Sequence, residues 1–368
     1  MKTQQQELIY QIASTRIPGV GDIVGKKLIA YCGGPEAVFK EKKSNLARIQ
    51  GISPKTLAGI FDPALLKRAE QEIRFMEKHR IQSLYFTNDD YPARLKQCID
   101  SPLMLYYKGK AVLNRQKIIS IVGTRKATNY GQSVIAELAG GLRQYNVLIV
   151  SGLAYGIDTL AHKSALQNQM DTVAVLAHGL DRIYPFLNRG LAEKIMHQGG
   201  LLTDFMSGTN PDRENFPKRN RIVAGMSDAV VVVESAKKGG ALITADIANS
   251  YNRDVFAVPG KIKETYSEGC NFLIKTNRAA LIQSPDDLIY LMGWKEQKKK
   301  PVIQRKIFVE LAENERKLVE LLKAQDEMGI DQLCIKSKMS ATKVASALLN
   351  LEFEGLVKCL PGKVYKLI

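Results

Sequence analysis

Between residues 118 and 258 the chain alternates short apolar runs with glycine-bearing turns and amphipathic segments, and no other feature restricts its fold as strongly. The clearest run, AVVVV at 229–233, holds five apolar residues, of which four are β-branched. Such runs are typical of strands that are buried on both faces. Helical segments between them predict an α/β fold, with a mostly parallel sheet that carries helices on both faces. The predicted strands are 118–122, 147–150, 172–176, 201–203, 229–233 and 255–258.

Small and basic residues follow several of these strands. Ligands of open parallel sheets bind beyond the carboxyl ends of the strands, where helix N-termini and free backbone N–H groups attract anions. The sequence therefore predicts a phosphate-binding edge, and its candidate contacts are Gly123, Thr124, Arg125, Lys126, Ser151, Gly152 and Gly240. The dinucleotide fingerprint Gly-x-Gly-x-x-Gly is absent from the first turn, so we expect no nicotinamide cofactor.

A second basic cluster lies at 216–225, FPKRNRIVAG, directly before the valine-rich strand. Its proline suits the first turn of a helix, on which Lys218 and Arg221 share one face while Arg219 and Asn220 turn elsewhere. We expect the cluster near the same edge of the sheet, with a solvated basic face as the alternative. The residues leave open which of Arg219 and Arg221 faces the groove. Candidate contacts, with a stacking platform at Phe186 or Phe216, are Phe186, Phe216, Lys218, Arg219, Asn220 and Arg221.

The charge balance favours a polyanionic partner. The 368 residues include 53 Lys and Arg against 37 Asp and Glu, a net charge of +16, and such an excess binds phosphates with release of counterions. A merely soluble basic protein is the alternative. The five cysteines include no Cys-x-x-Cys, so we expect no disulfide framework, no metal site and a cytoplasmic location. No signal peptide or membrane span is expected.

Differences in sequence pattern and composition divide the chain into a helical domain at 1–80, the α/β domain at 81–292, a basic linker at 293–312 and a final domain at 313–368. Near the start, IPGVG at 17–21 opens a helix in the manner of a helix-hairpin-helix motif, whose glycines let backbone N–H groups approach a phosphate. A weaker copy follows at 51–57. A structural hairpin that does not touch DNA is an equal alternative.

The last domain reads as three helices and a hairpin, which predicts a winged helix. In a DNA-binding interpretation Lys336, Lys338 and Lys343 contact the duplex backbone. Because Ser340, Ala341 and Thr342 have few groups that read bases, a protein-interaction module is slightly favoured.

The central motifs resemble one known family, the DNA-processing protein A family (DprA/Smf). The resemblance covers about residues 90–290 and is carried by IVGTR at 121–125, SGLAYGID at 151–158, GLD at 179–181, FP with RNRI at 216–222, GALITA at 240–245 and VFAVPG at 255–260. The sequence departs from the family pattern at Ala177-His178, Thr203-Asp204 and Gly239-Gly240.

The resemblance implies a Rossmann-like domain that binds single-stranded DNA in a basic pocket, with Arg125 as the pocket arginine and Arg219-Asn220-Arg221 along the same groove. It also implies a homodimer and a partner of the RecA recombinase type, onto which DNA is passed without catalysis in natural transformation or recombination. These expectations come from the resemblance and not from composition.

An enzymatic alternative is a nucleotide phosphoribohydrolase, whose fold is similar and whose glycine-rich motif ends in a glutamate. The corresponding stretch, 238–246, keeps the glycines but lacks that glutamate. Cleavage of a glycosidic bond needs positioned carboxylates, and Asp158, Asp181 and Glu234 all lie at or near strand ends. Helix capping and hydrogen bonding at the edge are their structural alternative. The four histidines do not have the spacing of metal ligands.

Overall fold

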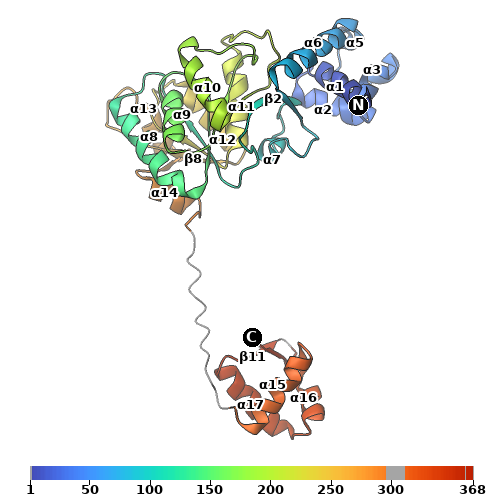
Figure 1. Ribbon diagram of the computed structural model, residues 1–368, viewed down its shortest axis with the longest axis vertical. Coiled ribbons are helices and arrows are strands. Elements are labelled where there is room, and N and C mark those ends of the chain that lie inside the picture. Colours follow the sequence, from blue (N-terminus) through green and yellow to red (C-terminus); the bar gives the residue numbers. More distant parts are fainter. Residues whose placement is uncertain (1, 296–310, 361, 368) are drawn as a thin grey trace. The chain divides into compact units, whose positions relative to one another are not determined.

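The computed structural model describes residues 2–295, 311–360 and 362–367, and these form two compact units (Figure 1). The first unit ends at Lys295 and the second begins after it. The helical region 1–80 and the sheet region 81–292, which the sequence separates, pack together within the first unit. Most of the linker predicted at 293–312 lies outside the described residues.

Nine strands of the described residues form one sheet in the first unit, in the order β1-β2-β6-β5-β4-β3-β7-β8-β9. Neighbours are parallel except for β1–β2 and β2–β6. The six predicted strands are all present, whereas β1, β2 and β9 were not predicted. The bounds are β1 (Gln82–Tyr85), β2 (Met104–Gly109), β3 (Ile118–Val122), β4 (Leu148–Ser151), β5 (Thr172–Val175), β6 (Gly200–Thr203), β7 (Ala229–Val232), β8 (Asp254–Ala257) and β9 (Ala280–Leu281).

Helices cover both faces of this sheet because the strand residues are apolar on both sides. In β3, Ile119 and Ile121 pack against helices α8, α9 and α14, whereas Ile118 and Val122 pack with α11, α12 and α13. This arrangement confirms the predicted α/β fold. The bounds are α7 (Ala93–Lys96), α8 (Asn129–Leu142), α9 (Ile157–Gln167), α10 (Arg189–Gln198), α11 (Asn215–Met226), α12 (Gly240–Ser250), α13 (Glu268–Lys275) and α14 (Pro285–Leu291).

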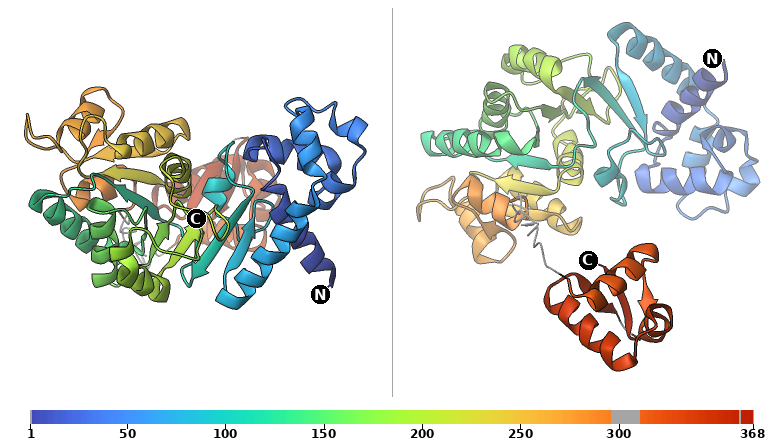
Figure 2. Two further views of the ribbon diagram at one scale, coloured as in Figure 1. Left: turned by 90° about the horizontal axis from the view of Figure 1, so that it is seen from above. Right: turned by 60° about the horizontal axis from the view of Figure 1, so that its bottom comes forward.

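The N-terminal helices lie beside the edge of the sheet that carries β1 and β2 (Figure 2). Their apolar side chains share a core with Met104 and Tyr106 of β2, so the region has no separate core of its own. The bounds are α1 (Lys2–Ser14), α2 (Asp22–Cys32), α3 (Pro35–Lys40), α4 (Lys43–Leu46), α5 (Pro54–Ile60) and α6 (Pro63–His79).

The second unit has the predicted winged-helix architecture. Its helices surround an apolar core that includes Leu318, Leu333 and Leu348, and the antiparallel pair β11–β12 forms the wing. The bounds are α15 (Glu313–Ala324), β10 (Met328–Gly329), α16 (Ile330–Ser337), α17 (Ala341–Phe353), β11 (Val357–Leu360) and β12 (Val364–Leu367). Across the described residues, no helix combines the length and apolar character that crossing a membrane requires.

Candidate nucleic-acid interface

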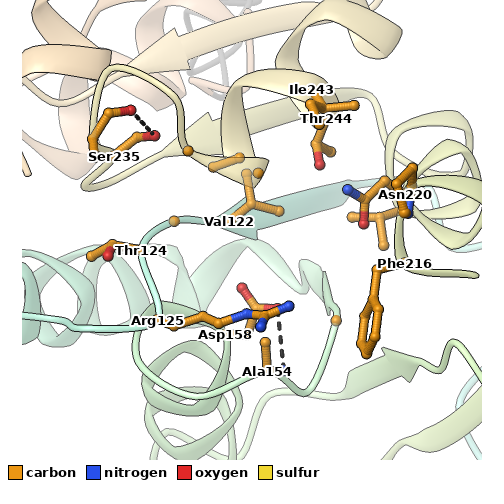
Figure 3. A pocket seen from close by; sticks show the side chains of 18 of the residues that line it. Val122, Thr124, Arg125, Ala154, Asp158, Phe216, Asn220, Ser235, Ile243 and Thr244 are labelled. Atoms are coloured by element: carbon orange, nitrogen blue, oxygen red, sulfur yellow. Dashed lines mark hydrogen bonds between the residues drawn. The ribbon is translucent and has the colours of Figure 1, made fainter. Parts of the chain in front are cut away.

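An open cavity of about 430 Å³ lies at the carboxyl ends of β3, β4 and β7, where the sequence predicts a ligand edge (Figure 3). Loops from distant parts of the chain form its walls, and the cavity is therefore assembled only by the fold. The predicted contacts that line it are Gly123, Thr124, Arg125, Lys126, Gly152, Phe216, Arg219, Asn220 and Gly240.

The loop from β3 to α8 carries Arg125, and Glu234 holds this loop in place. The buried Glu234 carboxylate accepts hydrogen bonds from Thr128 N–H, at 3.0 Å, and from the Thr128 hydroxyl. Thr124 N–H donates to the Glu234 backbone carbonyl at 2.7 Å. Thr128 also caps α8, since its hydroxyl accepts the Gly131 N–H. These contacts give Glu234 a structural role, and they leave the Arg125 side chain exposed to solvent.

Arg125 lies over an aromatic ring on the opposite wall. Its guanidinium carbon is 5.3 Å from the Phe216 ring centroid, and the Tyr184 ring lies 6.0 Å beyond that of Phe216. A guanidinium over a ring in this way makes a cation–π contact, and both groups can stack on a base or bind a phosphate. The cavity therefore combines a cation and a stacking surface at one point (Figure 3).

Arg219 forms the floor of the cavity rather than its rim. It is only 4% exposed, and its Nη1 donates to the Gly152 carbonyl at 2.6 Å and to the Val175 carbonyl. Its Nε has no hydrogen-bond partner among the described residues. A Cβ on Gly152 would overlap Nη1, so this close approach requires glycine. The buried charge adds positive potential at the floor of the cavity.

Asp158 lies close to Arg219, on the same side of Gly152. A Cβ on Gly152 would be 2.6 Å from its Oδ2. Burial raises the pKa of the Asp158 carboxyl, although the Arg219 charge and the N–H of Ala154, at 3.3 Å, oppose the shift. Asp158 thus balances part of the buried Arg219 charge.

Four predicted contacts do not line this cavity. Of the two arginines left open, Arg219 faces the cavity and Arg221 does not, because Arg221 turns toward the helical region. Lys218 is exposed, with its Nζ 3.7 Å from Glu214 Oε1, and it does not line the cavity either. Neither Lys218 nor Arg221 lines this cavity, and contact of these two residues with DNA stays a prediction.

Ser151 and Phe186 are the other two. The Ser151 side chain is buried, and its hydroxyl donates to the Ile121 carbonyl at 2.6 Å. Phe186 is 72% exposed and lines a separate groove beside α10. Ser151 is the last residue of β4, and Phe186 lies between β5 and α10, so residues near strand ends also hold the sheet or face away from this cavity.

The sequence interpretation missed part of the far wall, which is formed by Ser235, Ala236, Gly239 and Tyr266. Ser235 N–H donates to the Tyr266 carbonyl at 2.7 Å, so a loop before α13 closes the wall. The paired glycines at 239–240 could have indicated the part of this wall that precedes α12. Tyr266 comes from a loop with no recognisable pattern, and only the fold brings it here.

The remaining polar groups have structural partners. Asp181 accepts Gly208 N–H at 2.9 Å and pairs with Arg182. His178 Nε2 accepts Tyr184 N–H at 3.2 Å while Nδ1 faces the Gly179 carbonyl, and burial lowers the pKa of this ring. Within residues 2–295, 311–360 and 362–367, no group of three or more His, Cys, Asp or Glu side chains is placed to hold a metal.

The hairpin at 17–21 contacts the sheet region. At the start of α2, Asp22 Oδ1 accepts Leu103 N–H at 2.9 Å, and Lys26 Nζ donates to Ser101 Oγ at 2.6 Å. The helix end that a phosphate would approach is therefore next to protein, which favours the structural alternative for this hairpin.

Comparison with known proteins identifies the class. Residues 82–293 match the family described as DNA recombination-mediator protein A, and residues 309–363 match the DprA winged helix domain. The chain belongs to this family.

Among individual relatives, Protein Smf of Synechocystis is 33% identical, over 98% of both chains. The DNA processing protein DprA of Streptococcus pneumoniae is 38% identical, over 68% of this chain and 96% of that protein. The X-ray structure of DprA from Streptococcus pneumoniae matches with a TM-score of 0.66 and 32% identity, over 77% of this chain and 97% of that one. A structure of the Helicobacter pylori protein, described for its single-stranded DNA binding mode, matches with a TM-score of 0.54 and 28% identity, over 58% and 96%.

Proposed function

We propose that this chain binds single-stranded DNA in the cavity at the carboxyl edge of the sheet. The observation that carries the proposal is the exposed Arg125 guanidinium 5.3 Å above Phe216, within a wall of small residues. Arginine and backbone N–H groups bind phosphates, and an aromatic ring stacks on any base. The expected binding has little sequence preference, because such contacts read the backbone and ring faces rather than base edges.

The matched pair Arg125→Ala and Lys218→Ala tests this site. Both variants remove one exposed cation, but only Arg125 lines the cavity. Loss of a stacked, phosphate-binding arginine is expected to weaken binding by about 1–3 kcal/mol and to reduce the salt slope by roughly one. Lys218→Ala is expected to stay within about twofold. A mobility-shift titration of labelled single strand at several salt concentrations, with single- and double-stranded competitors, measures both quantities.

Equal losses in the two variants, or none in Arg125→Ala, would show that the cavity is not the binding site. Arg219→Ala is a poorer test than Arg125→Ala. Because Arg219 donates to two backbone carbonyls, its loss disturbs the fold as well as the charge of the floor.

The proposal is for binding without turnover. Two of the candidate carboxylates, Glu234 and Asp181, are engaged with backbone N–H groups, and Asp158 balances Arg219. The phosphoribohydrolase alternative predicts release of free base from nucleoside monophosphates. Incubation followed by chromatography of the bases decides between the two, and release at an enzymatic rate contradicts the binding proposal.

Delivery of the bound strand to a RecA-type recombinase, in natural transformation or recombination, is part of this proposal and rests on membership of the family. A homodimer and a cytoplasmic location, where such a recombinase acts, are also part of the proposal and rest on membership of the family. Light scattering measures the dimer, and a strand-exchange assay with the recombinase measures delivery.

For the winged helix, duplex binding and protein interaction are both retained as alternative functions. Lys338 and Lys343 are exposed in this domain, and Lys336 donates a hydrogen bond to Gln325.

A further inference from the structure

Helix α11 carries two arginines with opposite surroundings. Arg219 and Asn220 line the cavity. Arg221, the next residue, turns toward the helical region, where its Nη2 lies 2.8 Å from Asp22 Oδ2 and 2.9 Å from Asp204 Oδ2. Its Nη1 also donates to the Asp100 carbonyl. One short helix therefore connects the cavity with a polar junction on its other side.

Three parts of the first unit meet at this junction. Asp22 begins α2 of the N-terminal hairpin, and its Oδ1 accepts the N–H of Leu103 just before β2. Asp204 directly follows β6. Arg221 comes from α11. The arginine is thus the only one of these charged groups that belongs to a helix lining the cavity.

The junction is partly shielded from water, and Asp22 is its most exposed charged group at 24%. The side chains of Arg221 and Asp204 are 16% and 10% exposed. Burial raises the pKa of the Asp204 carboxyl, while the Arg221 charge opposes that shift. Asp204 Oδ1 has no hydrogen-bond partner among the described residues. Two carboxylates share one guanidinium here, so weakening any contact leaves a buried charge poorly compensated.

The cavity end of α11 has little freedom to shift. Arg219 Nη1 is held between the Gly152 and Val175 carbonyls, and there is no room for even a Cβ on Gly152 beside it. Because a helix moves as a rigid body, a rotation or slide that follows changes around Arg221 must also move Arg219 and Asn220.

We propose that Arg221 is a positioning residue, through which docking of the N-terminal hairpin on the sheet region holds Arg219 and Asn220 in the geometry that binds DNA. The helical region then supports DNA binding without touching the DNA. This inference rests on the proposed function.

Asp22→Ala tests the inference, because the charge and positioning explanations predict opposite changes in the affinity for single-stranded DNA. If the junction acts on DNA only by charge, removing an anion strengthens binding. If it acts by positioning, the same change weakens binding, by about fivefold, or roughly 1 kcal/mol. The salt slope should stay unchanged, because no phosphate contact is lost. Glu77→Ala is the matched control, since it removes an exposed carboxylate from α6 of the same region.

Hydrogen exchange of the α11 amides in the DNA-free protein gives a second readout. Faster exchange in Asp22→Ala but not in Glu77→Ala is expected. A parallel variant, Arg221→Lys, keeps the charge and loses the two-carboxylate fork, and should show the same pattern. Unchanged α11 exchange with equal or tighter DNA binding in Asp22→Ala overturns the inference. If the parent protein does not bind single-stranded DNA, the proposed function fails, while the exchange result still reports the coupling.

Discussion

Two glycine-bearing turns of the first unit, at 152–156 and at 17–21, have similar sequence textures and different surroundings. The turn that leads into α9 borders the cavity, next to the exposed Arg125 and Lys126. The turn that leads into α2 lies against the sheet region, where Asp22 contacts Leu103 and Arg221.

The difference teaches that glycine at a helix start predicts a close backbone approach but not the group that approaches. The surrounding charge decides this. Beside the cavity, cations are exposed or lie in the floor, which suits a phosphate. In the first turn of α2, the Asp22 carboxylate already interacts with the helix N-terminus and pairs with Arg221, so a phosphate would find no unpaired positive charge from these groups.

The largest expected effect comes from Gly156→Ala. Gly156 has φ 74° and ψ −125°, and a Cβ there would be 2.6 Å from the Arg125 carbonyl carbon and closer still to the Thr124 oxygen. We expect the free energy of unfolding to fall by about 3 kcal/mol. Because the overlap displaces the Arg125 backbone, single-strand affinity should fall by about tenfold or more. Urea unfolding and a mobility shift measure the two effects.

Gly19→Ala is the control on the other turn. Gly19 has φ 75°, and a Cβ there would lie 3.1 Å from Thr56 Oγ1. A loss of about 1–2 kcal/mol in unfolding free energy is expected from the strained backbone. Its effect on DNA affinity should be the smaller of the two, because Gly19 does not line the cavity. Equal losses of affinity would end the distinction between the turns.

Much of the fold follows from local pattern. The six apolar runs became strands β3 to β8, and Thr128 caps α8, because both depend on neighbours in sequence. β9 was missed because it has only two residues, and β1 because its sequence, QSLY, is half polar; β2 lies outside the parallel series and pairs antiparallel with both neighbours. The winged helix was predicted for the same local reasons.

The site was predictable only in part, because orientation is a property of packing. Helical spacing places Arg219 and Arg221 on different faces of α11, but only the docked N-terminal region shows which face is already occupied. The sequence predicts a stacking platform at Phe186 or Phe216 without distinguishing between them. Only Phe216 has an arginine over its ring.

A smaller effect on the free energy of unfolding is expected from a change of pH, and it should come from the buried histidines His178 and His162. Burial lowers the pKa of His178, and burial together with Arg219 lowers that of His162 to about 3. In the unfolded chain a histidine takes up a proton near its ordinary pKa of about 6.5, whereas these buried rings stay neutral in the folded protein. The free energy of unfolding should therefore fall as pH drops below that value. For His162 the slope should approach about 1.4 kcal/mol per pH unit below its unfolded-state pKa, and His178 adds to it in the same direction.

Urea unfolding at pH 7.5, 6.5 and 5.5 checks this dependence. His178→Asn should be less stable at pH 7.5, because the ring accepts Tyr184 N–H, and should show a flatter dependence on pH. His197→Gln, at an exposed position of α10, should behave like the parent. A parent whose stability is constant over this range would contradict the assignment of neutral buried histidines.

The smallest effect is expected at the weaker hairpin copy. Lys55 is exposed at the start of α5, where Ser53 Oγ already accepts Thr56 N–H at 3.1 Å, so one of the N–H groups that a phosphate would use is satisfied. Lys55→Ala should change affinity for single- or double-stranded DNA by less than about twofold, as expected for an exposed charge distant from the ligand. The same mobility-shift titration measures it beside Arg125→Ala. A tenfold loss confined to duplex DNA would instead show that the second hairpin binds the duplex, and the helical region would then be a DNA-binding surface as well as a support for α11.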